Sequence, residues 1–293
     1  NLEVKMILTQ FDPNKKAVIN PSDLVKPRAK MPKVAVTCFS KDTFKRMVEC
    51  YGGENVTVRS LANLDITVYE TVYKDAKVAL YLSPVGAPAC ALLLEDIFAL
   101  GVEKGVMFGT CGVLDKSIED CSIIIPDSAV RDEGTGYHYA PASDEIRVNK
   151  KHTDKFIDIL DELGCSYTRG KVWTTDAFYR ETPDKMKLRK EQGCICVDME
   201  CSAVAAVADF REKEVFQFFY AADNLDADKW DMRSLDNRDK LEKLASALLE
   251  TETMDGRDVE TLLGIQKNVE SEEEEPSLEK DEAKTETKEA ETP

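Results

Sequence analysis

The chain contains one nearly continuous apolar run, Val215-Phe216-Gln217-Phe218-Phe219-Tyr220-Ala221-Ala222, which ends at Asp223-Asn224. A strand with one face in water alternates apolar and polar residues, whereas a run without that alternation is typical of a strand buried on both faces of a largely parallel sheet. The run therefore predicts an α/β protein. Its carboxyl end is a position where such sheets form ligand sites.

Outward from this run, predicted strands and helices alternate along the chain. Strands are expected at 34–38, 66–73, 77–82, 105–109, 122–125, 171–174 and 195–197, and helices at 89–100, 153–163, 183–191, 199–210 and 238–249. The strands 66–73 and 77–82 are close enough to form a hairpin, and Pro126 is expected to stop the strand before it. This pattern predicts a single three-layer α/β domain, with a central mixed, twisted sheet flanked by helices.

The charge is unevenly distributed. Asp and Glu number 56 against 39 Lys and Arg, a net charge of −17 over 293 residues. This excess argues against nucleic acid or an anionic membrane as a partner, because both would repel the chain. No run reaches the roughly 18 apolar residues of a membrane span and no signal peptide is visible, so a cytoplasmic location is expected.

Composition also divides the chain. Residues 271–293 hold nine Glu and one Asp against three Lys, and Leu278 is the one large apolar residue there. Such a segment cannot bury enough surface to offset its ordering entropy. We expect an extension at 1–30, one domain at 31–265 and a disordered acidic tail at 266–293. The tail is interpreted as a solubility segment, with a docking segment as the alternative.

Nine cysteines and two histidines bear on metal binding. An odd number of cysteines, mostly inside apolar runs, indicates reduced thiols. Cys194, Cys196 and Cys201 are close in sequence, but a zinc site usually adds a second Cys/His pair, and His138 and His152 are distant from them. Buried structural cysteines are favoured, so no metal and no cofactor are predicted.

Acidic and aromatic residues follow the predicted strands. Thr110-Cys111-Gly112 follows 105–109, Thr175-Asp176-Ala177-Phe178-Tyr179-Arg180 follows 171–174, Asp198-Met199-Glu200 follows 195–197, and Asp223 follows 215–222. Carboxylates bind hydroxyl groups and aromatic rings stack on flat rings. The mixture therefore indicates a neutral, hydroxylated ligand with a flat ring.

Three of these stretches resemble, in this order, the nucleoside phosphorylase family of uridine phosphorylase, hexameric purine nucleoside phosphorylase and methylthioadenosine nucleosidase. They are Phe108 to Gly112, Thr175 to Tyr179 and Val197 to Ala203. Gly86-Ala87-Pro88-Ala89 is similar to the family's Gly-x-Pro-Ser element, and Ala129 to Pro141 looks most like the uridine phosphorylase branch. The resemblance covers residues 30–250. It implies cleavage of the bond between ribose C1′ and a base nitrogen, by a homodimer or a trimer of dimers.

The resemblance also implies site residues. Glu200 matches the glutamate that grips the ribose 2′- and 3′-hydroxyls, and Met199 the methionine beneath the sugar. Asp223 matches the general acid of purine-cleaving members. The remaining matches are a phosphate site at Thr110 and Gly109 and a base site at Phe178, Cys111, Gly112, Asp198 and Arg131.

Each main assignment has a structural alternative. Glu200 could be an acid stabilised by the start of a helix, Asp223 could cap a turn through its own backbone, and Phe178 could belong to the core.

The chain departs from the family at the phosphate site. The early Gly-Asp-Pro-x-Arg loop is replaced by Thr37 to Thr43, and Met107 stands where a second arginine is expected. Thr110 and the amides of 109–112 remain as anion donors, and Lys41, Arg46 or Arg59 could substitute. Thr182 and Asp184 replace the residues that read uracil.

Three functions therefore stay open. The first is phosphorolysis at an atypical phosphate site, which would use inorganic phosphate as co-substrate. The second is hydrolysis without phosphate, and the third is nucleoside binding without turnover. The base and the 5′ substituent are also undetermined.

Overall fold

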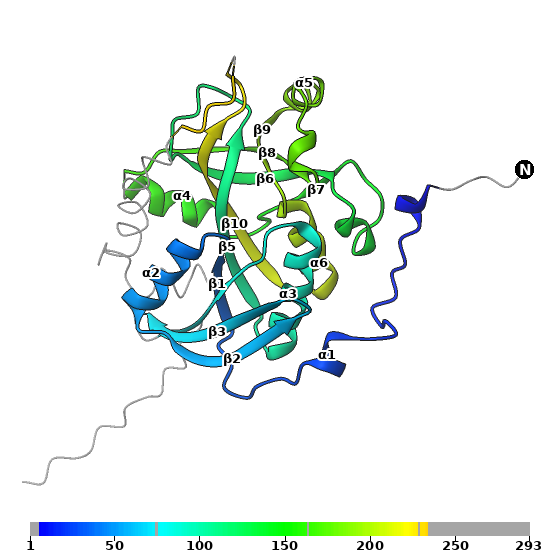
Figure 1. Ribbon diagram of the computed structural model, residues 1–293, viewed down its shortest axis with the longest axis vertical. Coiled ribbons are helices and arrows are strands. Elements are labelled where there is room, and N and C mark those ends of the chain that lie inside the picture. The colour runs from blue at the N-terminus through cyan, green and yellow to red at the C-terminus, as the bar shows by residue number, and fades with distance from the viewer. Residues whose placement is uncertain (1–5, 74–75, 163, 228, 234–293) are drawn as a thin grey trace, which may run out of the picture.

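The computed structural model describes residues 6–73, 76–162, 164–227 and 229–233 (Figure 1). Within these residues the strands are β1 (Val34–Cys38), β2 (Glu54–Leu61), β3 (Leu64–Tyr73), β4 (Ala76–Leu82), β5 (Lys104–Val113), β6 (Ile123–Asp132), β7 (Glu145–Arg147), β8 (Tyr167–Thr175), β9 (Cys194–Asp198) and β10 (Glu214–Asn224). The α-helices are α1 (Pro21–Leu24), α2 (Lys41–Tyr51), α3 (Ala87–Leu100), α4 (Thr153–Glu162), α5 (Pro183–Glu191) and α6 (Cys201–Arg211). Short 3-10 turns are η1 (Ile7–Thr9), η2 (Thr135–His138) and η3 (Phe178–Arg180).

These strands form one mixed sheet, as predicted. Strand β5 pairs in parallel with β1 and β10, β1 pairs in parallel with β4, and β2, β3 and β4 form an antiparallel edge. Strand β9 pairs with β5 and β8, β8 with β6, and β6 with β10, so five strands close into a ring. The ring was not predicted, because closure depends on pairings between strands far apart in the sequence.

Helices cover both faces of the sheet, with α3 and α6 on one and α2 and α4 on the other (Figure 1). Strand β10 explains the apolar run at its centre. Phe216 and Phe218 face α4, where their ring centroids lie 5.0 and 4.9 Å from that of Phe156. Gln217 points the other way, and its Nε2 donates to the Cys201 carbonyl at the start of α6, 3.1 Å away. Both faces are buried, which confirms the three-layer prediction.

Several strand boundaries were predicted wrongly. Strand β5 continues to Val113, through the 110–112 stretch expected to follow it, and β8 begins at Tyr167 rather than at 171. Pro126 does not stop β6, which continues to Asp132. The register with β8 shifts between Pro126 and Ser128, and a bulge of this kind tolerates a residue that has no N–H to donate. The longer strand brings Asp132 and Glu133 to the same end of the sheet as the ligand stretches.

The extension before residue 31 packs on the domain. Val25 is buried, and the amide of Arg28 donates to the carbonyl of Leu100 at the end of α3, 2.9 Å away. Phe11 packs edge-on against Phe210 of α6. The predicted helix at 238–249, the boundary at 265 and the tail at 266–293 lie outside the described residues. No helix of the described part of the chain is long and apolar enough to span a membrane.

Two adjacent leucines on α3 provide a test of the core. Leu93 is fully buried, whereas Leu92 is 55% exposed. We expect Leu93→Ala to lower the free energy of unfolding by about 2–5 kcal/mol, because the cavity cannot collapse fully. Leu92→Ala should change it by less than about 0.5 kcal/mol. Urea denaturation followed by circular dichroism measures both, and equal effects would contradict the orientation of α3.

Candidate active site

A cavity of about 160 Å³ opens at the carboxyl ends of β5, β9 and β10. It is lined by the last residues of these strands and the residues just after β9 and β10, by Phe39 and Val85 after β1 and β4, and by η3. Apart from Gly109 and Arg131, the residues proposed for the site from sequence all line it; they are Thr110, Cys111, Gly112, Phe178, Asp198, Met199, Glu200 and Asp223. Val197, Leu225 and Glu181 complete the lining. The structure therefore brings eight of the ten residues proposed from the sequence together around one cavity.

Asp198 fixes the turn between β9 and α6. Its Oδ2 accepts from the amides of Glu200 and Cys201, at 3.0 and 2.6 Å, and its Oδ1 accepts from the hydroxyl of Thr174 on β8, at 2.7 Å. The free amides at the start of α6 are thus taken up by a carboxylate of the chain itself. Asp198 lines the cavity, but these hydrogen bonds join its carboxylate to groups of the protein itself.

Glu200 is 7% exposed, and its Oε1 accepts from the amide of Gly86, 2.5 Å away. Gly86 has φ +95°, a conformation in which glycine alone is unstrained, and it begins α3. Burial, and next the charge of Asp198, raise the pKa of Glu200. Burial also raises the pKa of Asp198, but Thr174 and two amides oppose that shift. Of these two carboxylates, Glu200 is therefore the one whose charged form would be stabilised more by further hydrogen-bond donors, such as the hydroxyls of a ligand.

Asp223 lies at the end of β10, where the register with β5 shifts between Ala221 and Asp223. The indole N–H of Trp230 donates to Asp223 Oδ2 at 2.8 Å. Glu181 lines the same cavity, and burial, followed by the charge of Asp223, raises its pKa to about 7. Neither Trp230 nor Glu181 was identified from the sequence. The one signal for Glu181 was its place three residues after Phe178.

Phe178 is 47% exposed and lines the cavity, so it is not a core residue. Tyr179 packs edge-on against it, with ring centroids 5.1 Å apart. The aromatic surface stays open toward the cavity mouth, as a ring that stacks on a ligand requires.

Two residues proposed for the site lie elsewhere. Arg131 is buried and donates to the carbonyl of Pro141 at 2.7 Å and to the hydroxyl of Ser143 at 2.9 Å, so it holds the loop after η2. It does not line the cavity. Gly109 stands beside the ring of Phe39, and a Cβ there would lie 2.8 Å from the ring. Gly109 therefore permits close packing of β5 next to the site.

The lining of the cavity is acidic. It includes Glu181, Asp198, Glu200 and Asp223, and among the described residues no lysine or arginine lines it. Arg59 instead donates to Asp96, at 2.8 Å. Lys41 and Arg46 are also absent from this lining.

Met107 likewise lies away from the cavity, since it is 2% exposed and packs in the core between α3 and α6. An arginine at position 107 would be buried in that core and not in the cavity. The described residues contain no group of three or more His, Cys, Asp or Glu side chains that could hold a metal ion.

Comparison with known proteins identifies the family of the chain. A sequence model of the phosphorylase superfamily matches residues 33–251. The chain belongs to the phosphorylase superfamily. The purine nucleoside phosphorylases, DeoD-type, of Bacillus cereus and Bacillus thuringiensis are each 28% identical to it over 174 residues, which are 57% of this chain and 68% of theirs.

Solved structures share the fold. Uridine phosphorylase from Vibrio fischeri ES114 has a TM-score of 0.63 at 20% identity, over 82% of this chain and 95% of its own. Purine nucleoside phosphorylase from Toxoplasma gondii, solved in complex with immucillin-H, has a TM-score of 0.65 at 18% identity, over 77% of this chain and 94% of its own. These likenesses confirm the fold class. Together with the family match, they confirm the resemblance seen in the sequence and the expectation of a nucleoside phosphorylase-type enzyme.

The raised pKa of Glu181 predicts a pH-dependent effect on stability. Its pKa rises from 4.5 to about 7 on folding, so folding favours the protonated form. The associated stability is complete below about pH 4.5 and is lost as the pH rises through 7. Glu181→Gln cannot ionise, so it should raise the melting temperature at pH 8 relative to the parent and change it less at pH 4.5. Exposed Glu191→Gln is the control, and an equal shift at both pH values would contradict the assignment.

Proposed function

We propose that the chain cleaves the N-glycosidic bond of a nucleoside and transfers the ribosyl group to phosphate. The observation that supports this most directly is the single cavity shared by Glu200, Asp223 and the open ring of Phe178. A hydroxyl-binding carboxylate, an acid and a stacking surface are what a nucleoside requires of a site. Family membership and the purine nucleoside phosphorylase relatives favour the same chemistry.

Each residue has a separate role in the proposed cleavage. Glu200 accepts hydrogen bonds from the ribose 2′- and 3′-hydroxyls, and Met199 packs against the sugar. Phe178 stacks on the base, and Asp223 acts as the general acid toward the departing base. The C1′–N bond breaks through an oxocarbenium-like state, and fixing the sugar and relieving charge on the base both lower that barrier.

The cavity offers few groups that could bind phosphate. The hydroxyl of Thr110 is the donor that remains for it, because residues 109–112 belong to β5 and their backbone pairs with β10, while four carboxyl groups line the same cavity. A buried dianion needs cations or several aligned donors. This lining therefore favours a second candidate function, hydrolysis of the same bond by water without phosphate.

We also propose a homo-oligomer, a dimer or a trimer of dimers, by analogy with the family. Large apolar and aromatic residues stay exposed at the cavity mouth or beside it, namely Val85, Phe178, Tyr179 and Trp230. A second copy of the chain that covered this rim would shield it from water.

Glu200→Ala should reduce turnover of every nucleoside to a similar extent, because the ribose contact is common to all of them. Loss of a charge-assisted hydrogen bond in the transition state costs about 2–4 kcal/mol, a fall of roughly 30- to 1000-fold in kcat/KM. Steady-state assays with inosine, adenosine and uridine measure it, with Glu191→Ala on the exposed face of α5 as the control. Turnover within threefold of the parent would remove Glu200 from the site.

Asp223→Asn should affect purine nucleosides selectively. The amide still offers an oxygen to the indole of Trp230, but it has no carboxyl proton to transfer, so purine cleavage should fall about 100-fold or more. Pyrimidine cleavage should fall less. Equal losses on both bases would assign Asp223 a structural role.

The dependence on phosphate separates the two candidate reactions. We expect either half-saturation by phosphate in the millimolar range or release of base without phosphate, because the described lining lacks cations. Base release measured against phosphate concentration, with identification of the sugar product, is the test. Saturation at micromolar phosphate with ribose 1-phosphate as the sole sugar product would contradict the atypical site.

A further inference from the structure

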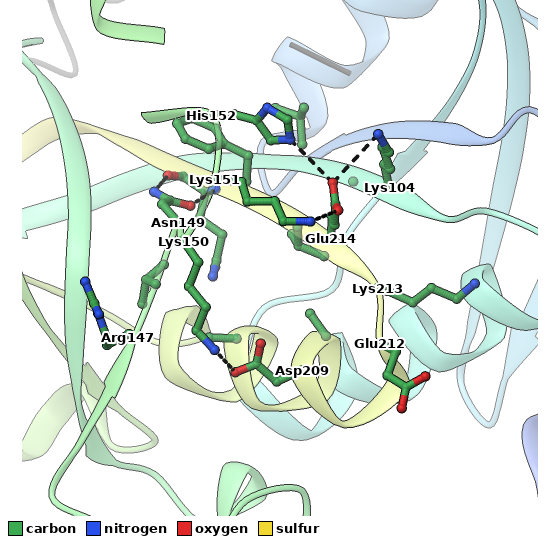
Figure 2. Close-up of a pocket in the computed structure, with 18 residues that line it drawn as sticks. Lys104, Arg147, Asn149, Lys150, Lys151, His152, Asp209, Glu212, Lys213 and Glu214 are labelled. Atoms are coloured by element: carbon green, nitrogen blue, oxygen red, sulfur yellow. Dashed lines mark hydrogen bonds and ion pairs between the residues drawn. The ribbon is translucent and has the colours of Figure 1, made fainter. Parts of the chain in front are cut away.

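A second cavity, of about 300 Å³, lies at the opposite ends of β5 and β10 from the active site, and Figure 2 shows the side chains that line it. It is lined by the starts of β5 and β10, by the later part of α6, and by the end of β7 with the loop that follows it. Strand β10 has Glu214 in this cavity and Asp223 in the active site. Nine residues of extended strand span about 30 Å, so the two cavities are separate sites.

Basic side chains surround this second cavity in a chain whose net charge is −17. The lining residues with basic side chains are Lys104, Arg147, Lys150, Lys151, His152 and Lys213, against the acids Asp209, Glu212 and Glu214. Glu212 pairs with Lys15, which is not part of the lining. The cavity therefore has an excess of positive charge.

Three of these basic side chains gather around the carboxylate of Glu214. Lys151 pairs with Oε1 of this carboxylate, while Lys104 Nζ and His152 Nε2 lie 3.7 and 3.4 Å from Oε2 (Figure 2). One negative charge thus holds two lysines and an imidazole together. A second anion in this part of the cavity would have the same three groups within reach and would compete with Glu214 for them.

The loop that presents these groups is fixed by Asn149. Its Nδ2 donates to the carbonyls of Gln217 and Pro126, at 2.6 and 3.1 Å, and its Oδ1 accepts from the amide of Gln217, at 2.8 Å. Asn149 itself has φ +48°. These bonds tie the loop to β10 and β6, and Lys150, whose Nζ is 2.5 Å from Asp209 Oδ2, ties it to α6.

The remaining wall is apolar. It consists of Val106, Val148, Ala205, Ala208, Val215 and Phe216, from four different parts of the chain. A fixed cluster of cations beside an apolar wall suits an amphiphilic anion. A volume of about 300 Å³ lies within the range of small-molecule sites and would admit a sugar phosphate.

We propose that this cavity is a binding site for the phosphate ester of a small metabolite. Lys104, Lys151 and His152 hold the phosphate beside Glu214, and the apolar wall takes the carbon skeleton. A phosphate matches the site because its several oxygens accept from several donors at once. The proposal is independent of the reaction proposed for the active site.

Isothermal titration calorimetry with ribose 5-phosphate tests the site, and ribose is the neutral control. We expect a Kd below about 1 mM for the phosphate ester and no measurable binding of ribose. Lys151→Ala should weaken binding about tenfold, because it removes a charge-assisted donor and leaves Glu214 paired with Lys104 and His152. Glu214→Gln should tighten binding at least threefold, because it removes the carboxylate that competes with the ligand for the same donors.

Opposite effects of the two variants distinguish a binding role from loss of structure, since damage to the fold would weaken both. Lys45→Ala, on the exposed face of α2, is the matched control for a lost lysine and should leave the Kd within twofold of the parent. The proposal is overturned if Lys151→Ala and Glu214→Gln both change the Kd less than twofold or change it in the same direction. Binding that is lost in Glu200→Ala but kept in Lys151→Ala would place the ligand in the active site and overturn it as well.

Discussion

The buried carboxylate of Asp198 is the constraint on which the active site depends. Taking this charge out of water is costly, and the cost is offset by donors from two elements, the Thr174 hydroxyl of β8 and two amides at the start of α6. Because these bonds fix the first turn of α6, they also fix Glu200, whose carboxylate reaches the start of α3 at Gly86. The two helices then pack together through Leu94 and Val204. One satisfied charge thus links β8, β9, α6 and α3 around the cavity.

Much of the fold followed from local patterns, and the exceptions have a common cause. The unbroken apolar run of β10 predicted a strand buried on both faces, and Phe216 and Gln217 do pack on opposite helical layers. The end of β6 was misplaced at Pro126, because a bulge opposite β8 accommodates the proline and sequence alone does not reveal that register. Closure of the ring between β6 and β10 was missed for the same reason, since it depends on partners about a hundred residues apart.

The place of the candidate site was predictable where its residues lie at strand ends. Glu200 lies just after β9 and Asp223 lies at the end of β10, and the family resemblance then suggested a role for each. Glu181 and Trp230 were not predicted as site residues. Their approach to Asp223 depends on how the segments that follow β8 and β10 are placed in space, which the sequence does not show. Arg131 was assigned to the base site from its neighbours in sequence, whereas the structure uses its guanidinium to hold the carbonyl of Pro141. The sequence patterns indicated which segments lie together, but not the direction in which the buried side chain of Arg131 points.

The two cavities have opposite electrostatic character although β5 and β10 line both. The N-terminus of α6 would ordinarily attract an anion, but Asp198 already occupies its amides, so the helix dipole does little for phosphate in the active site. At the other ends of β5 and β10, one carboxylate holds three basic groups. Inorganic phosphate added to the enzyme therefore meets a repulsive cavity and an attractive one. An effect of phosphate on turnover identifies it as the attacking nucleophile only if the effect persists in Lys151→Ala, where the second cavity is weakened and the active-site lining is unchanged.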